Sequence, residues 1–142
     1  MMAILKDNDR KQLTKLLEQL INPVKLILFT QDFECEYCQV ARELTDETSA
    51  LSTKLTLEVH DFAREADLAE GMGIDKIPAL AVVGDKDYGI RLYGIPSGYE
   101  FAALIETITD VSRRQHGLPA NVVAELADVD RPVRMQVLIT PT

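Results

Sequence analysis

Helical and extended patterns follow one another along this chain in an order that constrains the fold more than any other feature. Apolar residues recur at helical spacing over residues 7–20, and a mostly apolar strand is expected at 24–29. A second helical pattern at 38–51 separates that strand from an alternating one at 55–61. Two strands joined by a helix form a right-handed βαβ unit. The first half of the chain therefore predicts two parallel strands with a helix on their sheet.

The second half of the chain predicts a hairpin and a covering helix. A short helix is expected at 64–72, and strands at 79–83 and 88–93 are separated by a turn rich in glycine and aspartate. Ser97 and Glu100 have the spacing of a capping box, which predicts the start of a last long helix. The whole pattern indicates an α/β fold with a central mixed β-sheet flanked by helices.

Length and charge restrict the class of protein. A chain of 142 residues suits one domain of ordinary size and can bury a core without metal or disulfide staples. Its 15 Lys plus Arg against 23 Asp plus Glu give a net charge of −8, which repels phosphate backbones. No apolar run approaches the roughly 18 residues of a membrane span, and the first ten residues do not resemble a signal peptide. We therefore expect a cytoplasmic protein without nucleic-acid or membrane partners.

The end of the chain repeats the pattern of its beginning. Pro132 aligns with Pro23, and in the same register Leu126 aligns with Leu17. A helical pattern, a proline stop and an apolar strand at 133–139 thus recur in the same order. Self-similarity of this kind is typical of tandem copies of one unit.

The repeat suggests a domain organisation. Residues 1–115 are expected to form one domain, and residues 116–142 a linker plus the first helix and strand of a truncated second copy. The alternative is a C-terminal helix–strand appendage that shares the pattern by chance. In either case the strand at 133–139 has no sheet of its own, and unpaired strand edges seek partners. We expect it to pack onto the same molecule or a second copy, with dimerisation or swapping through residues 118–142.

Cys35-Glu36-Tyr37-Cys38 stands between an apolar strand and a helix. This spacing puts both thiols in the first helical turn, close enough for a disulfide with little backbone movement. Cys35 is expected to face solvent at the positive end of the helix dipole, which favours its thiolate. Cys38 is expected to turn inward, from where it can attack a mixed disulfide formed by Cys35. These two cysteines are the candidate catalytic residues.

A pair of cysteines at this spacing can also be half of a zinc site. Such a site needs two further ligands, and His60 and His116 are the only candidates. His60 ends a strand and His116 stands in the expected linker, so both are interpreted as ordinary surface histidines. We therefore expect neither a metal nor a cofactor.

A proline opens the strand that follows the helix at 64–72. Pro78 can stand there simply because a strand's first residue need not donate to the ladder. Together with the cysteine motif, residues 73–79 resemble the cis-proline loop of the thioredoxin fold. That resemblance implies that Pro78 lies against the two sulfurs and that the Ile77 backbone can pair with an extended substrate peptide. Tyr37 completes the expected substrate-binding set.

Residues 1–115 resemble the N-terminal unit of the tandem-thioredoxin-fold protein disulfide oxidoreductases of prokaryotes, which are also described as glutaredoxin-like. The resembling stretches are residues 22–26, 35–38, 74–79 and 93–103. The resemblance implies a thioredoxin fold and thiol–disulfide exchange with protein substrates. It further implies that Cys35 is the nucleophile, Cys38 the resolving thiol and Pro78 the cis-proline. A thioredoxin-reductase-like flavoprotein is the expected reductant, and a second unit with its own cysteine pair is expected after Thr142.

Three departures from these families bear on the chemistry. Leu28 and Phe29 stand where thioredoxins proper place a buried acid, so no obvious carboxylate base supports Cys38. The dipeptide between the cysteines is Glu-Tyr, whereas Pro-Tyr is common in glutaredoxins. Asp32 and Glu34 occupy an approach where glutaredoxins often carry a basic residue for glutathione. Because the carboxylates of glutathione would meet like charge, we expect protein partners instead.

Glu34 and Glu36 flank the candidate nucleophile, and their charges are expected to tune it. A negative charge nearby disfavours the Cys35 thiolate and so opposes the helix dipole. A less stabilised thiolate makes the disulfide less oxidising, which favours reductase or isomerase-like work.

Two other functions remain open. The flavoprotein that reduces alkyl hydroperoxide reductase has an N-terminal domain with a similar tandem architecture and a similar Gly-x-Pro-x-Gly-x-Glu-Phe segment, here residues 94–101. That resemblance indicates an electron-relay domain. It also implies a first unit that has lost its cysteines, whereas Cys35 and Cys38 are present here. The second alternative is a non-enzymatic thioredoxin-fold interaction domain whose thiols are incidental.

Overall fold

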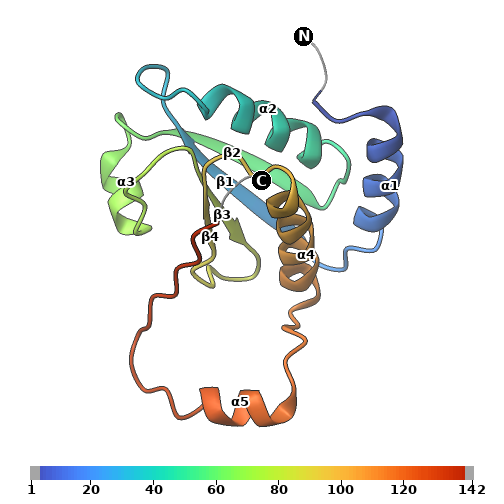
Figure 1. Ribbon diagram of the computed structural model, residues 1–142, viewed down its shortest axis with the longest axis vertical. Coiled ribbons are helices and arrows are strands. Elements are labelled where there is room, and N and C mark those ends of the chain that lie inside the picture. Colours follow the sequence, from blue (N-terminus) through green and yellow to red (C-terminus); the bar gives the residue numbers. More distant parts are fainter. Residues whose placement is uncertain (1–3, 140–142) are drawn as a thin grey trace.

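The computed structural model describes residues 4–139, apart from the side chain of Tyr99. Figure 1 shows a sheet with helices around it and an arm that carries the last helix. In chain order the elements are α1 (Asp7–Leu17), β1 (Val24–Thr30), α2 (Cys38–Ser49), β2 (Leu55–Asp61), α3 (Ala66–Gly71), β3 (Ala79–Val83), β4 (Arg91–Tyr93), α4 (Tyr99–Arg113) and α5 (Ala120–Leu126). Among the described residues, no helix has the length and apolar character needed to cross a membrane.

The four strands form one mixed sheet in the order β2-β1-β3-β4. β1 runs parallel to β2, with Val24 opposite Leu55, as the βαβ pattern predicts. β3 is antiparallel to β1 and to β4, which confirms the predicted hairpin. The returning strand is shorter than the expected 88–93, since its ladder with β3 ends at Arg91 and Gly89 has a positive φ that does not suit a strand.

The two faces of the sheet carry separate cores, because successive side chains of a strand point to opposite faces. Leu26 and Leu28 of β1 belong to the larger core, which the buried sides of α1, α2 and α4 complete. Phe29 points the other way, into a smaller cluster with Ala69 of α3 and Ile74. Both clusters meet at the end of β1, from which the cysteine-bearing loop departs.

The close approach of α4 to the end of β3 requires a glycine. A Cβ atom at Gly84 would lie 2.6 Å from Cγ1 of Val111 in α4. Valine is stiff at χ1 and Val111 is nearly buried in the larger core, so this methyl group has little freedom to step aside. The absence of a side chain at Gly84 therefore lets α4 lie close against the sheet.

The start of α4 differs from the predicted capping box. The helix begins at Tyr99 with Gly98 as its cap residue, and no side chain caps it. Gly98 has a positive φ of 62°, a conformation that leaves Ser97 outside the cap position. The amides of Glu100 and Phe101 bind the backbone carbonyls of Ser97 and Gly98 instead. The prediction of a Ser97–Glu100 box is wrong, although the helix itself is present.

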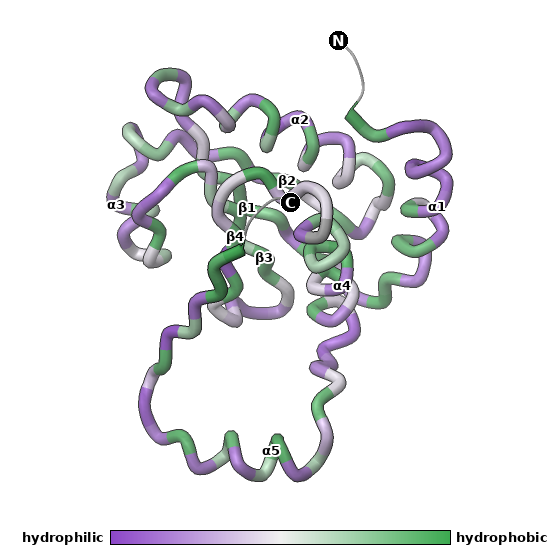
Figure 2. Tube along the Cα trace, in the orientation of Figure 1, coloured by the Kyte–Doolittle hydropathy of each residue, from purple (hydrophilic) through white to green (hydrophobic). Residues whose placement is uncertain are grey.

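The C-terminal segment confirms the predicted helix and contradicts the predicted strand. α5 lies on an arm that leaves the body of the molecule after α4 (Figure 1). Residues 133–139 make no ladder with any described strand, and Met135 and Leu138 are 86% and 96% exposed. Hydrophobic residues recur along the arm (Figure 2). An extended segment becomes a strand only where a neighbouring strand pairs with its backbone, and within residues 4–139 no strand pairs with this one. The segment returns to the body of the molecule, where Arg134 lines a pocket with Phe62, Ile74 and Asp75, but it adds no strand to the sheet. Packing onto a second copy stays a prediction.

Candidate active site

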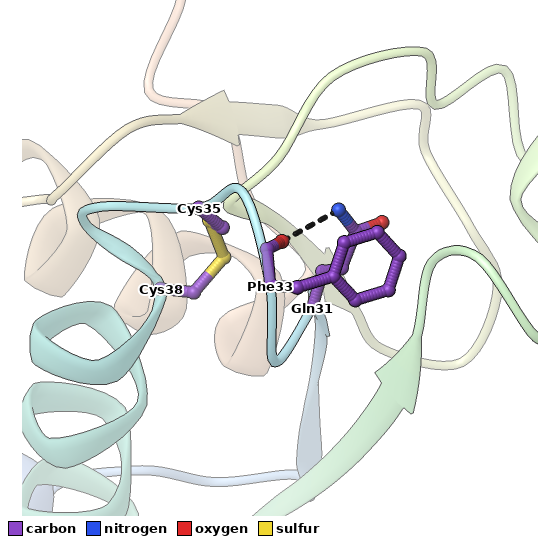
Figure 3. The surroundings of a disulfide bond; sticks show 4 residues. All are labelled: Gln31, Phe33, Cys35 and Cys38. Carbon is purple, nitrogen blue, oxygen red and sulfur yellow. Dashed lines mark hydrogen bonds between the residues drawn. A yellow bond between two sulfur atoms is a disulfide. The ribbon is translucent and has the colours of Figure 1, made fainter.

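The two cysteines lie at the junction of β1 and α2. A short loop, residues 31–37, follows β1 and carries Cys35, while Cys38 is the first residue of α2. The two are joined by a disulfide with a Cα–Cα distance of 5.5 Å, within the usual range. Cys38 is 3% exposed and Cys35 is half-buried, so the first sulfur is the accessible one. Figure 3 shows the disulfide beside the loop that leads to it.

The electrostatics of this junction come from the start of α2 and from the acidic loop. No acidic residue occupies the first turn of α2, and no side chain caps it. The amides of that turn and the helix dipole therefore remain available to an anion such as a thiolate. Asp32, Glu34 and Glu36 are exposed, and none of them makes an ion pair within the described residues.

The loop before Cys35 is held in an uncommon shape. Glu34 has a positive φ of 51°, a region that residues with a side chain rarely adopt. The amide of Gln31 donates a 2.7 Å hydrogen bond from Nε2 to the carbonyl of Phe33, which closes the loop on itself (Figure 3). Phe33 and Tyr37 are 57% and 53% exposed, so an exposed aromatic residue stands two positions before Cys35 and another two positions after it. Sequence reasoning singled out Tyr37 and missed Phe33, because a lone loop aromatic has no periodicity that distinguishes it.

The segment with Ile77 and Pro78 lies at the same end of the sheet. Ala79, the first residue of β3, stands opposite Phe29, near the end of β1 from which the cysteine loop departs. The Ile77–Pro78 peptide bond is cis. The amide of Gly94 donates a 2.9 Å hydrogen bond to the Pro78 carbonyl. Among the hydrogen bonds of the described residues outside the regular elements, none uses the backbone of Ile77.

His60 occupies the edge strand beside Phe29. Its ring stacks on that of Phe29 with centroids 5.4 Å apart. Nδ1 lies 3.0 Å from the carboxylate of Glu65, and Nε2 lies 3.3 Å from that of Glu58. Its side chain is only 22% exposed, so the interpretation of His60 as an ordinary surface histidine is wrong.

His116 lies apart in the linker, where its ring accepts a hydrogen bond from the Leu118 amide. Within residues 4–139, no group of three or more His, Cys, Asp or Glu side chains is arranged to hold a metal ion.

The titration of His60 leads to a prediction about stability. Burial lowers the pKa of His60, but its hydrogen bonds to Glu65 and Glu58 outweigh burial and raise that pKa above its ordinary value. A raised folded-state pKa stabilises the fold fully below the unfolded-state pKa of about 6.5, and the contribution disappears as pH rises through the folded-state pKa. We expect His60→Gln to lower the free energy of unfolding more at a pH of about 5.5 than at about 8.5, on either side of that range.

Urea denaturation of both proteins at the two pH values measures this difference. An equal loss at both would show that His60 stabilises the fold by its stacking on Phe29 alone. His116→Gln is the matched control, because that side chain is exposed in the linker and has no carboxylate partner within the described residues.

Comparison with known proteins adds an independent observation. No protein-family model matches this chain, and no curated protein matches it. Among solved structures, a protein disulfide oxidoreductase from Aeropyrum pernix K1 is 25% identical with a TM-score of 0.78, over 87% of this chain and 54% of that one. The alkylhydroperoxide reductase protein AhpF from Enterococcus faecalis is 26% identical with a TM-score of 0.77, over 89% of this chain and 61% of that one.

Thioredoxins share the fold with lower scores. A thioredoxin mutant from Halobacterium salinarum is 24% identical with a TM-score of 0.52, over 75% of this chain and 88% of that one. This chain spans between 54% and 61% of the length of the oxidoreductase and AhpF structures. The chain therefore has a thioredoxin fold with a disulfide-forming Cys35–Cys38 pair, and it is similar to a protein disulfide oxidoreductase and to the N-terminal domain of AhpF.

Proposed function

We propose that this protein is a thiol–disulfide oxidoreductase that acts on protein substrates through Cys35 and Cys38. The observation that carries the proposal is the asymmetry of the disulfide at the start of α2, where Cys35 is half-buried and Cys38 is 3% exposed. This arrangement suits two successive exchange steps, because an incoming group can reach only the first sulfur.

The proposed reaction transfers two electrons from the Cys35–Cys38 dithiol to a substrate disulfide. In the reduced protein, the Cys35 thiolate attacks one sulfur of a substrate disulfide, which forms a mixed disulfide and releases the other substrate sulfur as a thiolate. The Cys38 thiolate then attacks Cys35 Sγ, closes the disulfide seen in the structure and releases the second substrate thiolate. The substrate disulfide is reduced, the Cys35–Cys38 dithiol is oxidised, and the reverse sequence oxidises a substrate dithiol.

Substrate recognition is proposed to use the surface around the accessible sulfur. The Ile77 backbone is proposed to pair with an extended peptide next to Pro78, as in strand addition. Tyr37 and Phe33 supply exposed aromatic surface for side chains that flank the substrate disulfide. The acidic groups nearby disfavour glutathione, which carries two carboxylates of its own.

Glu34 and Glu36 belong to the same proposal as tuning residues. Both are exposed beside Cys35, so their charges oppose formation of its thiolate and make the disulfide less oxidising. This balance favours a reductase over an oxidase. A thioredoxin-reductase-like flavoprotein is the proposed source of electrons, and the cytoplasm is the proposed location.

An electron-relay role is the second candidate function. The similarity to AhpF favours it, since that similarity covers 89% of this chain at a TM-score of 0.77. The proposed domain organisation is compatible with this role. Residues 1–115 are proposed as one thioredoxin-like unit and residues 116–142 as the beginning of a second unit. Turnover with unrelated protein disulfides would favour the first candidate, and electron transfer restricted to a flavoprotein donor and one dedicated acceptor protein would favour the second.

A trapping experiment tests the proposed mechanism. In Cys38→Ser the first step remains and the second has no attacking thiol, so a mixed disulfide between Cys35 and the substrate should accumulate. Mass spectrometry under non-reducing conditions, with a peptide that contains one disulfide, measures the adduct and its site. In the wild-type protein the adduct should be absent at the same time point. Full multiple-turnover activity of Cys38→Ser would contradict the two-thiol mechanism.

A further inference from the structure

Residues 72–78, here called the proline segment, connect α3 to β3 and end with the cis-proline. The segment carries the backbone that is proposed to pair with substrate, so its position decides where a peptide lies relative to Cys35. It contains no helix or strand of its own, and Ile74 is its only residue besides Pro78 that is buried. Its placement therefore depends on contacts from neighbouring elements.

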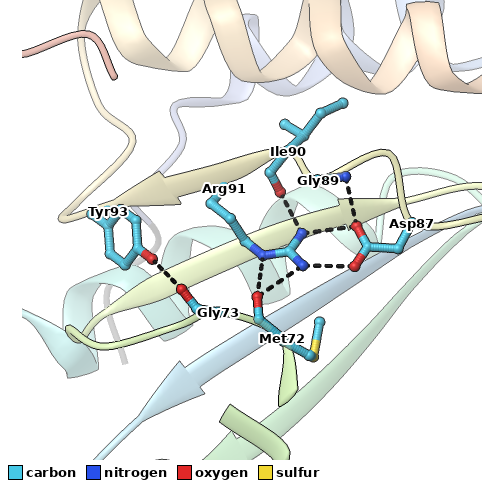
Figure 4. A network of polar contacts seen from close by, with 7 residues as sticks. All are labelled: Met72, Gly73, Asp87, Gly89, Ile90, Arg91 and Tyr93. Carbon is cyan, nitrogen blue, oxygen red and sulfur yellow. Dashed lines mark hydrogen bonds and ion pairs between the residues drawn. The ribbon is translucent and has the colours of Figure 1, made fainter. Parts of the chain in front are cut away.

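The amides of Met72, Gly73 and Ile74 bind carbonyls of α3, and a charged side chain, Arg91 of β4, contacts the segment from the other side. Its Nε and Nη2 donate hydrogen bonds of 3.2 and 3.1 Å to the carbonyl oxygen of Met72, the first residue of the proline segment. The Arg91 side chain is 13% exposed, so this pair of bonds lies largely out of water. Figure 4 shows the guanidinium between the segment and the turn that precedes β4. A side chain of the edge strand thus fixes a backbone carbonyl 19 residues earlier in the chain.

The guanidinium of Arg91 is itself held in place. Nη1 and Nη2 face the two carboxylate oxygens of Asp87 at 2.9 and 2.6 Å, a bidentate pair. The hydrogen bonds with Arg91 also lower the pKa of Asp87, which keeps the carboxylate ionised. Asp87 accepts a further 2.9 Å hydrogen bond from the Gly89 amide, so the turn and the arginine form one unit. The planar fork of arginine suits this geometry, and a lysine has no equivalent arrangement of donors.

The same strand makes further contacts with the proline segment. The Tyr93 hydroxyl lies 3.5 Å from the Gly73 carbonyl, and its ring lies 5.5 Å from Nζ of Lys76. At the far end, the Gly94 amide binds the Pro78 carbonyl at 2.9 Å. β4 and the residue after it therefore contact the segment from its start to its end, and Arg91 supplies the only charged anchor to its backbone among the described residues.

We propose that Arg91 is a positioning residue for substrate binding. By fixing the Met72 carbonyl it sets the course of the proline segment, and so the place at which the Ile77 backbone meets an extended peptide. This inference rests on the proposed function and deepens it. Arg91 touches neither the sulfurs nor the substrate in this scheme, so it should affect peptide substrates and leave the chemistry of the cysteines unchanged.

The test compares a peptide disulfide with a small disulfide that has no peptide backbone. Turnover is driven by dithiothreitol, with the direct reaction subtracted, for a synthetic peptide containing one disulfide and for bis(2-hydroxyethyl) disulfide. In Arg91→Met we expect KM for the peptide to rise about fivefold to tenfold with kcat little changed, because a misplaced binding backbone weakens binding. The rate with the small disulfide should stay within about twofold of wild type, and the midpoint potential of the Cys35–Cys38 pair should stay the same within error.

Two further variants keep the test decisive. Arg113→Met removes the same charge from an exposed position of α4 and should leave KM unchanged. Asp87→Asn keeps Arg91 but removes the carboxylate that holds it, and should raise the peptide KM by a smaller factor even if Arg91→Met does not fold. An unchanged peptide KM in both Asp87→Asn and Arg91→Met, or a parallel loss with both substrates, would overturn the inference. Failure of the wild-type protein to reduce the peptide would overturn the proposed function itself, and the inference with it.

Discussion

Replacement of Cys35 with serine is expected to abolish turnover of a protein disulfide, by at least about a thousandfold. Serine is close in size, so the fold should persist, but its hydroxyl is not ionised at neutral pH and is a far weaker nucleophile than a thiolate. Cys38 cannot substitute for it, because its side chain is 3% exposed under the first turn of α2. In enzymes that use a nucleophilic side chain, its removal lowers the turnover rate by factors of this size.

The measurement is the initial rate of peptide disulfide reduction by wild type, Cys35→Ser and Cys38→Ser. Circular dichroism confirms that each variant is folded. Cys38→Ser controls for the loss of the disulfide, since it should still form the mixed disulfide with the peptide, which Cys35→Ser should not form. A residual rate within about tenfold of wild type in Cys35→Ser would remove the basis for an enzymatic function and favour the interpretation of the chain as a non-catalytic interaction domain.

Truncation of Phe29 is expected to have the largest effect on stability. Phe29 is fully buried at the point where β1 meets α3, and it also supports the ring of His60. Removing a buried phenylalanine leaves a cavity and loses the transfer free energy of the ring, for a cost of about 3–5 kcal/mol. We therefore expect Phe29→Ala to lower the free energy of unfolding by that amount in urea denaturation.

A matched control for this substitution lies in the cysteine loop. Phe33 is 57% exposed there, and Phe33→Ala should change the free energy of unfolding by less than about 1 kcal/mol. Equal losses in the two variants would show that the smaller core contributes little, and that stability resides in the larger core of α1, α2 and α4.

The order of the elements and the place of the cysteines could be predicted because both follow from local patterns. The apolar run of β1 and the alternation of apolar and polar residues along β2 predict strands from the local sequence, and the helical spacing after Cys38 predicts α2 in the same way. The similarity to thioredoxin folds and the mixed sheet confirm that part of the interpretation. Of the two thiols predicted in the first helical turn, Cys38 lies there as the first residue of α2, whereas Cys35 lies in the loop before the helix and reaches Cys38 through the disulfide.

The parts that could not be predicted depend on distant partners or on single backbone angles. The contact of Arg91 with the Met72 carbonyl joins two segments whose proximity exists only after folding. The strand expected at 133–139 has the right composition and lacks a neighbour, which composition does not report. The predicted capping box is absent because Gly98 has a positive φ angle, which the sequence pattern does not report. Phe33 carries no pattern at all, and its exposure beside the disulfide is visible only in the fold.

The tight approach at Gly84 has a consequence for how sequences of this type can diverge. A Cβ at position 84 would lie 2.6 Å from the Val111 methyl group, so a side chain at position 84 and this methyl group cannot occupy the same space. An alanine at position 84 is compatible with this helix position only when position 111 carries a smaller side chain. The pair should therefore vary together among homologous sequences, glycine with a branched residue and alanine with a small one, even though the two positions are far apart in the chain and distant from the cysteines.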